Sequence, residues 1–521
     1  MAGSSGDAAG DLDRISNLPD DLLHHILGFL PDAAAASRTA VLSRRWQRVW
    51  VHAHGLAFTA TPATCGAAPC RFAGFVDWAL ARRGDADIGS LQITTKPAGC
   101  AGACASPPRR ANDWIRHAMR HVVGSFVLVL PFGHRAGTDP PLAELPRHGR
   151  ATSIHMDLPH HSFHLPAAGA PASYAALTAL KLDWVQFSEE APGGGARRRT
   201  LGGFVSSCCP RLRKLELQWP GGLPQLVIRS GALEELHINS ADDMALLDVT
   251  APMLRVLNLQ CCFYDDDGGG GGGKAARIAA PALEEIGIVL LPNTTPPELT
   301  IHGLASVRRL TSIDLQMHGR FYRRTDVGFW LLENCPAAEH VEASLMHCAA
   351  HHAAPVPAFQ FVDRVPRHAA SIANLNVKRM ELAADRFPCC HLVACVSSLL
   401  LRCPNLRSLR IKFYDTYGGI CPRQCLPYAS EASRSHKEIC LYSLREVEIS
   451  GIVGVDEEMN LVGLLFKSSN SIRSVTLRTT TEMPDAIVSF GQMFWETIDQ
   501  KLMKIAYTDR GRWHFGDNLY T

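Results

Sequence analysis

Four cysteines near the start of the sequence are the residues whose type could hold a metal ion. Cys65, Cys70, Cys100 and Cys104 could supply four thiolate ligands to zinc. Their spacing is looser than that of the closely spaced cysteine pairs in structural zinc sites, and the Ala, Gly and Pro residues around them are typical of a linker. We expect no metal site and no cofactor, with this zinc quartet as the alternative.

Two other groups of residues match catalytic or binding motifs only in part. Gly268, Gly273 and Lys274 have the spacing of a phosphate-binding loop, but Ala275 stands where that loop needs Ser or Thr, and three aspartates precede it. Six consecutive glycines there predict a flexible insertion over residues 265–275. His160, His161 and His164 lack the glutamate of a metalloprotease helix, so we expect a surface loop. No nucleophile, dinucleotide or kinase motif nominates an enzyme.

Composition narrows the range of partners. The chain has 52 Lys+Arg and 50 Asp+Glu among its 521 residues, which argues against a general nucleic-acid surface. No apolar run is long enough to span a bilayer, and the first twelve residues have no secretory character. We therefore expect no membrane or nucleic-acid partner, a cytoplasmic and/or nuclear location, and 17 cysteines that are reduced thiols.

The clearest pattern of apolar residues lies in the segment from Asp13 to Trp50. Pro19 and the two acids after it are typical of a helix start, and Pro31 ends the helix. Asp32 can cap a second helix and Ser43 a third. Three short helices cannot bury all of their apolar side chains by themselves, so these pack either on the rest of the chain or on a partner.

The same segment resembles the F-box of plant F-box proteins in the order and spacing of Ile15–Leu23, Ile26-Leu27, Leu30-Pro31 and Val41–Trp46. The resemblance implies docking onto a Skp-type adaptor and, through it, onto a cullin ubiquitin ligase. Ala33–Ala36 departs from the larger or charged residues that are usual in the family, which weakens the expected contribution of the second helix. The residues carried over to the adaptor interface are Leu18, Pro19, Leu23, Ile26, Leu27, Leu30, Pro31, Val41, Leu42 and Trp46.

One apolar pattern recurs through the remaining sequence: apolar, two variable, apolar, one variable, apolar. Leu212, Leu233 and Leu254 begin three copies at a regular 21-residue spacing. This period and spacing are typical of leucine-rich repeats, in which parallel strands stack into a solenoid. Before the second, third and a later copy, an apolar residue and a turn with Gly or Pro recur (Ile228, Val249 and Ile278). The polar residue usual after each strand is mostly missing, so we expect irregular repeats.

The sequence thus predicts an α/β chain: a three-helix F-box followed by an irregular leucine-rich-repeat solenoid. The segment from Cys440 to Leu477 is similar to the FBD module of plant F-box proteins, which implies a C-terminal cap. The expected division is a disordered start (1–12), F-box (13–58), linker with the first repeat (59–112), solenoid (113–434) and FBD-like cap (435–521).

These expectations define a function and its alternative. The chain is predicted to be a non-catalytic substrate receptor of an SCF-type ubiquitin ligase that binds an unidentified target protein; the alternative is a repeat scaffold outside ubiquitin transfer. Alternate strand residues point away from the core. The predicted target-binding residues are Glu216, Gln218, His237, Asn239, Asn258, Gln260, Arg410 and Lys412.

Overall fold

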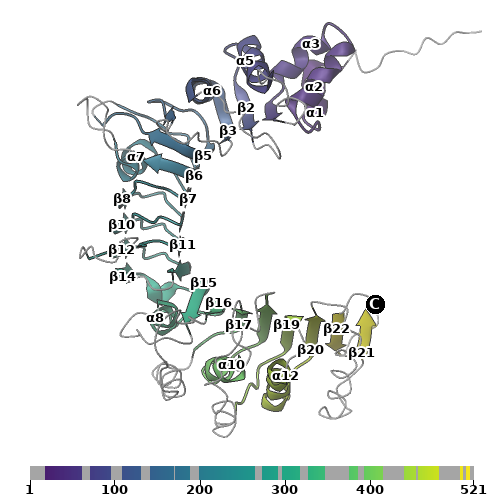
Figure 1. Cartoon of the computed structure of the whole chain (residues 1–521), viewed down its shortest axis with the longest axis vertical. Helices are drawn as coiled ribbons and strands as arrows, with labels where there is room; N and C mark the ends of the chain where they lie inside the picture. The colour runs from purple at the N-terminus through teal and green to yellow at the C-terminus, as the bar shows by residue number, and fades with distance from the viewer. Residues whose placement is uncertain are drawn as a thin grey trace, which may run out of the picture. The chain divides into compact units, whose positions relative to one another are not determined.

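The computed structural model is built of short helices and parallel strands (Figure 1). It divides into two compact units, residues 1–251 and 252–521, which are described one at a time. No helix among the described residues has the length and apolar character needed to cross a membrane. The structure describes residues 18–60, 71–95, 108–130, 141–168, 171–187, 199–264, 273–291, 296–316, 327–346, 375–384, 392–414, 439–452, 456–479, 505–508 and 512–516.

The first unit begins with the three predicted helices. Pro19 precedes the first helix, and the Asp32 side chain accepts a hydrogen bond of 2.7 Å from the Ala35 N–H and so caps the second. The Ser43 hydroxyl accepts one of 3.4 Å from the Trp46 N–H at the third. The elements are α1 (Asp20–Leu27), α2 (Ala33–Arg38), η1 (Thr39–Val41), α3 (Trp46–Val49) and η2 (Trp50–His52).

Parallel strands follow in the same unit. Seven of those that the structure describes pair side by side in one sheet in the order β1-β2-β3-β5-β6-β7-β9. Helices connect several of them, as parallel pairing requires long connections. A short strand, β4, adds to β5. The bounds are β1 (Gly55–Thr59), α5 (Arg71–Arg83), β2 (Ile88–Thr94), α6 (Pro108–His121), β3 (Val122–Val129), β4 (Leu142–Glu144), β5 (Ser153–His164), β6 (Ala179–Phe187), α7 (Leu201–Cys208), β7 (Lys214–Gln218) and β9 (Glu235–Asn239).

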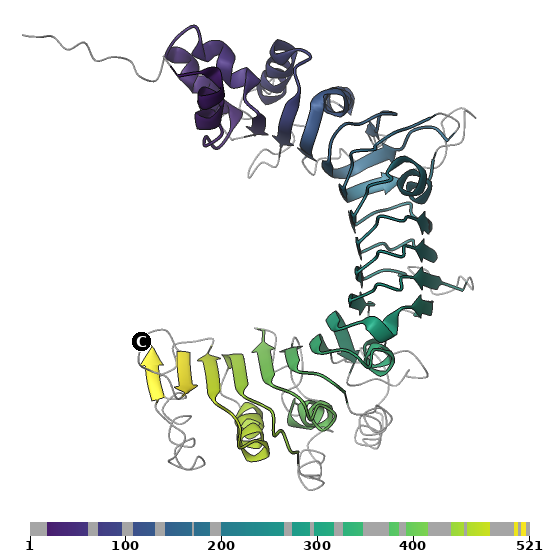
Figure 2. The ribbon, with the colours of Figure 1, turned by 180° about the vertical axis from the view of Figure 1, so that it is seen from behind.

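The 21-residue repeats contain a second strand. In the first unit, β8 (Gln225–Arg229) pairs in parallel with β10 (Leu246–Thr250), on the opposite side of the repeat from β7 and β9 (Figure 2). In the second unit, β12 (Ala275–Ala279) pairs in the same way with β14 (Glu298–His302). Ile228, Val249 and Ile278 therefore belong to strands. The sequence pattern predicted only that each is an apolar residue before a turn.

The second unit continues the parallel pairing in the order β11-β13-β15-β16-β17-β18-β19-β20. Its last strands, β22 and β21, pair antiparallel to β20 and to each other. The bounds are β11 (Val256–Gln260), β13 (Glu285–Val289), η3 (Leu304–Ser306), β15 (Arg309–Gln316), α8 (Val327–Asn334), β16 (His340–Met346), β17 (Arg379–Ala384), α10 (Leu392–Leu400), β18 (Ser408–Phe413), β19 (Glu446–Ile452), α12 (Asp456–Ser468), β20 (Ser474–Thr479), β21 (Ile505–Thr508) and β22 (Arg512–Gly516).

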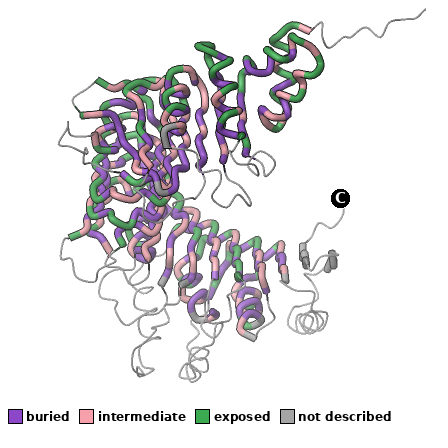
Figure 3. The backbone as a smooth tube through the Cα atoms, turned by 45° about the horizontal axis from the view of Figure 1, so that its top comes forward, coloured by how far each residue is buried: buried purple, intermediate pink, exposed green. Residues whose placement is uncertain are grey.

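The repeated apolar positions form the core of each unit, and the mixed α/β fold with stacked parallel strands is as predicted. Leu212, Leu215 and Leu217 are fully buried, and their counterparts in the other copies are also buried. Burial alternates along β7, β9 and β11, so every second side chain lies at the surface (Figure 3). Cys335 and Cys403 are buried beside the strands, and burial raises the pKa of both thiols to about 12.

Candidate functional site

One side of the helical segment packs against the first repeat of its own chain. Trp50 stacks on Phe75 and on Trp78 of α5, with ring centroids 5.9 Å apart in both pairs. The buried Arg83 side chain donates hydrogen bonds of 2.7 Å to the carbonyl oxygens of Val51 and Ala53, and so satisfies the backbone where η2 ends. The chain itself therefore covers this side of the helices.

A side-chain clamp joins the first and third helices. Arg45 Nε donates to Asp20 Oδ1 at 2.9 Å, and Arg45 Nη2 donates to the Leu18 carbonyl oxygen at 2.6 Å. The contact fixes the start of α1 beside the turn that leads into α3. It holds the residues between them at defined positions.

Five large apolar side chains of this segment are exposed to solvent. Leu22, Ile26 and Phe29 are spaced by four and three residues, so they share one face of α1 and the turn after it. Phe29 is 76% exposed, and Val41 at the end of η1 and Leu42 directly after it are 87% and 62% exposed. We call Leu22, Ile26, Phe29, Val41 and Leu42 the exposed apolar set. Covering each such side chain stabilises a complex by ~1.5–3 kcal/mol.

The structure separates the ten residues predicted for the adaptor interface into three groups by their exposure. Leu23, Leu27 and Trp46 are buried within the helices and support their packing. Leu18 and Leu30 are half-buried, and five side chains lie at the surface: Pro19, Ile26, Pro31, Val41 and Leu42. Which of them contact a partner stays a prediction.

Two members of the exposed apolar set, Leu22 and Phe29, were not among the residues that the sequence predicted for the adaptor interface. The spacing of Leu22, Ile26 and Phe29 is helical, and so is that of Leu23, Leu27 and Leu30. Periodicity cannot tell which of these two stripes faces the rest of the chain. In the structure, Leu23 and Leu27 face inward and Leu22 and Phe29 face outward.

Predicted target-binding residues of the first unit lie in a row of alternating charge on its strands. Lys214 Nζ lies 2.8 Å from Glu216 and 3.1 Å from Glu235, and Lys181 Nζ lies 3.6 Å from Glu216. Burial opposes ionisation of Glu216, but the two lysines outweigh it and lower the pKa of this carboxyl. His237 Nε2 lies 3.5 Å from Glu235. Glu216 and His237 are thus held by neighbouring side chains.

A pair of tryptophans lies next to this row. Trp184 and Trp219 stack face to face, with ring centroids 4.7 Å apart and an interplanar angle of 4°. Both have positive φ, and they directly follow Asp183 and Gln218, which are paired in register. Trp219 is exposed. Gln218 and Asn239 are half-buried on the neighbouring strands, so a target could contact amide groups and an aromatic face together.

In the second unit, the predicted residue Arg410 also has acidic neighbours. Its Nε donates to Glu448 at 2.8 Å and its Nη1 lies 3.3 Å from Glu381. Lys412 Nζ lies 4.5 Å from the centre of the Tyr414 ring. Asn258 and Gln260 are half-buried on β11. The predicted outward face is therefore present, although the structure does not test its partner.

The candidate metal and phosphate residues have other positions or lie outside the described residues. The expectation of a surface loop at the histidine cluster was wrong, because His161 and His164 are buried in β5. Lys274 Nζ donates to the Phe263 carbonyl oxygen at 2.6 Å. Gly268 and the four cysteines of the zinc alternative lie outside the described residues, and among described residues no His, Cys, Asp and Glu side chains group as metal ligands.

Comparison with known proteins agrees with this organisation. Residues 15–53 match the family model of the F-box domain. F-box/LRR-repeat protein 25 of Arabidopsis thaliana is 54% identical over 46 residues, which are 9% of this chain and 18% of that protein. A second F-box/LRR-repeat protein of the same plant is 38% identical over 125 residues, or 23% of each chain. The chain thus matches less than a quarter of the length of either.

A longer match extends beyond the helices. A putative F-box/LRR-repeat protein of Arabidopsis thaliana is 26% identical over 422 residues, covering 71% of this chain and 86% of that protein. The chain carries an F-box domain, and its relatives are plant F-box/LRR-repeat proteins.

Proposed function

We propose that this chain is the substrate-recognition subunit of an SCF-type ubiquitin ligase. Its F-box docks on a Skp-type adaptor that connects to a cullin, and its repeats hold a target protein. The mechanism is positioning: a tethered target meets the ligase at high effective concentration, without chemistry by this chain.

The observation that carries the proposal is the exposed apolar set within a domain that matches the F-box. Phe29, Val41 and Leu42 are large side chains that the chain leaves mostly in water, while Trp50 and Arg83 bind the opposite side to the first repeat. Exposed apolar side chains grouped on a small domain favour a protein partner. The F-box match indicates which partner.

Three buried thiols of the second unit lack the properties of a catalytic nucleophile. A nucleophilic cysteine needs a lowered pKa and access to solvent. Cys335, Cys395 and Cys403 have raised pKa values and are buried. They act as core side chains.

Capture of the adaptor by the full chain tests the proposal. A purified plant Skp-type adaptor should co-purify with the wild-type chain, and the double variant Val41→Asp with Leu42→Asp should lose the complex. Placing two carboxylates in an apolar interface leaves them desolvated and unpaired, which weakens binding by two orders of magnitude or more, roughly. Because both side chains are exposed, the free variant should unfold at the wild-type temperature.

A matched control separates docking from general surface effects. Met253→Asp introduces the same kind of charge at an exposed apolar residue outside the F-box, and it should bind the adaptor like the wild type. Failure of the wild-type chain to bind any Skp-type adaptor would favour a scaffold outside ubiquitin transfer. Equal loss in both variants would remove the assignment of the docking surface.

A further inference from the structure

A row of charged residues follows one edge of the parallel strands in the second unit. Each member directly precedes a strand, and its N–H donates a hydrogen bond of 2.8–2.9 Å to the carbonyl oxygen of the member before it. We call this the pre-strand row. In order it contains Arg255, Glu284, Arg308, Glu339, Lys378, Arg407, Arg445 and Arg473.

The first part of the pre-strand row alternates in charge. Arg255 Nη2 lies 2.8 Å from Glu284, and Lys378 Nζ lies 2.7 Å from Glu339. The hydrogen bond from Arg255 lowers the pKa of Glu284, and that from Lys378 lowers the pKa of Glu339; Arg308, which lies between the two acids, acts in the same direction on both. Every cation here therefore has an acidic neighbour in the row.

The alternation ends after Lys378. Arg407, Arg445 and Arg473 are three successive members with no acid between them. Neighbouring strands are ~4.8 Å apart, so like charges at adjacent positions repel one another. None of the three side chains makes a hydrogen bond or ion pair with the part of the chain that the structure describes. Among the described residues, this end of the row is a strip of three arginines with no paired acid, and only Arg407 also acts at longer range to lower the pKa of Glu339.

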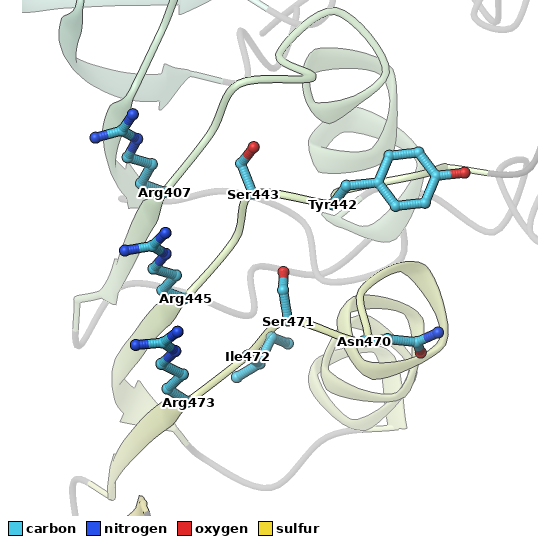
Figure 4. A pocket seen from close by; sticks show the side chains of 8 residues that line it. All are labelled: Arg407, Tyr442, Ser443, Arg445, Asn470, Ser471, Ile472 and Arg473. Carbon is cyan, nitrogen blue, oxygen red and sulfur yellow. The ribbon is translucent and has the colours of Figure 1, made fainter.

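The strip borders a hollow. Its volume is about 410 Å³, within the size range of sites for small molecules. The three arginine side chains project in the same direction from successive strands (Figure 4). Tyr442, Ser443, Asn470 and Ser471, from the turns before two of these strands, complete the lining. Except for the buried Ile472, every lining residue has a polar side chain.

We propose that this hollow binds a small soluble molecule with two or more phosphate groups. Guanidinium groups present paired N–H donors whose geometry matches phosphate oxygens, and they keep their charge at any physiological pH. From Arg407 to Arg473 the strip spans two strand spacings, roughly 10 Å, which is longer than a single phosphate group and matches a ligand with several linked phosphates. Several linked phosphates neutralise the whole strip.

Binding of inorganic tripolyphosphate to the full chain tests this site. Isothermal titration should detect binding that weakens as salt is added, and inorganic phosphate should bind much more weakly. The variant Arg445→Gln removes the central charge and should weaken tripolyphosphate binding by roughly tenfold or more, because one charge-assisted contact is lost. Arg445→Lys keeps the charge without the paired donors, so it should retain part of the affinity.

The unfolding temperature distinguishes a binding role from a structural one. Without ligand, Arg445→Gln relieves repulsion and should unfold at the wild-type temperature or slightly above it. With tripolyphosphate, the wild type should gain thermal stability that the variant does not gain. Arg379→Gln, at an exposed arginine outside the lining, makes the same change in net charge and should bind like the wild type.

Three results would overturn the proposal. The first is the absence of binding to the wild type at millimolar tripolyphosphate. The second is equal weakening by Arg445→Gln and Arg379→Gln, which would show attraction to overall charge only. The third is a short poly-glutamate peptide that binds as tightly as tripolyphosphate, which would make the strip a surface for acidic peptides. Because the site lies outside the F-box, adaptor capture should be the same in all of these variants.

Discussion

Charged side chains on the outward strand faces mostly contact one another. In the first unit, Lys214 lies between Glu216 and Glu235, and in the second, Arg410 lies between Glu381 and Glu448. Exposed ion pairs of this kind add little to stability. For the proposed target protein, we expect little gain from contacts with Glu216 or Arg410, whose charges are already paired, and more from contacts with Gln218 and Trp219. We therefore expect selectivity to depend on amide and aromatic contacts.

A half-buried carboxyl in β15, that of Asp314, makes stability depend on pH. Burial raises the pKa of Asp314 from 3.8 to about 6. Between these values the native chain keeps a proton that the unfolded chain has released, so the free energy of unfolding falls as pH rises. Above about pH 6 both states are ionised, and the contribution is constant. Asp314→Asn, which stays neutral, should therefore stabilise the protein more at about pH 7.5 than at about pH 4.5.

Urea unfolding of Asp314→Asn and the wild type at the two pH values measures this effect. Because other groups also titrate in this range, the free energy of unfolding of Asp314→Asn is compared with that of the wild type at the same pH. A difference in the free energy of unfolding that is equal at both pH values would show that the charge of Asp314 is not desolvated in the native chain.

At the residue scale, the sequence predicted which side chains are apolar but not which way they face. Leu23 and Trp46 were assigned to the interface and are buried, whereas Leu22 and Phe29 were omitted and are exposed. Both stripes of α1 have helical spacing, and only the packing of α1 on α3 distinguishes them. The arginines of the pre-strand row were missed for a related reason. They are separated by 38 and 28 positions, and only strand pairing places them side by side.

At the scale of elements, the core strands are connected in two ways. A 21-residue repeat must return the chain to the next parallel strand, and it does so here with a second short strand, as in β8 and β10. Longer repeats return through a strand, as with β12, or through a helix, as with α12, although the spacings that contain these two elements are nearly equal (29 and 28 residues). The sequence predicted the core strands because their apolar positions alternate. It did not predict the second strands, because each is only five residues long and lies close to turn residues.

The turn that follows β14 depends on a glycine. Gly303 has φ +107°, and a Cβ there would lie 2.1 Å from the Ala280 carbonyl oxygen. Gly303→Ala should therefore lower the free energy of unfolding by roughly 1–3 kcal/mol. Gly231 offers a control in another repeat turn, because a Cβ there has no neighbour within 4 Å. Chemical unfolding should show Gly231→Ala close to the wild type, and two equal losses would contradict the account.

At the scale of the whole molecule, the order of parts follows from the sequence: an F-box and then repeats. The F-box match and the longer relative agree with this order. The predicted boundary between the solenoid and an FBD-like cap stays a prediction. Strand, helix and strand do follow one another in β19, α12 and β20, but the repeats before them have the same succession. A boundary inside a continuous run of strand pairing leaves no separate core to identify it.

The central claim is that the exposed apolar set receives a Skp-type adaptor. Hydrogen–deuterium exchange of the full chain, with and without the adaptor, tests this claim most directly because it locates the contact along the chain. We predict slower exchange over α1 and η1 when the adaptor is present, and unchanged exchange over β7 and β9. Slower exchange confined to the strands, with α1 and η1 unaffected, would contradict the claim.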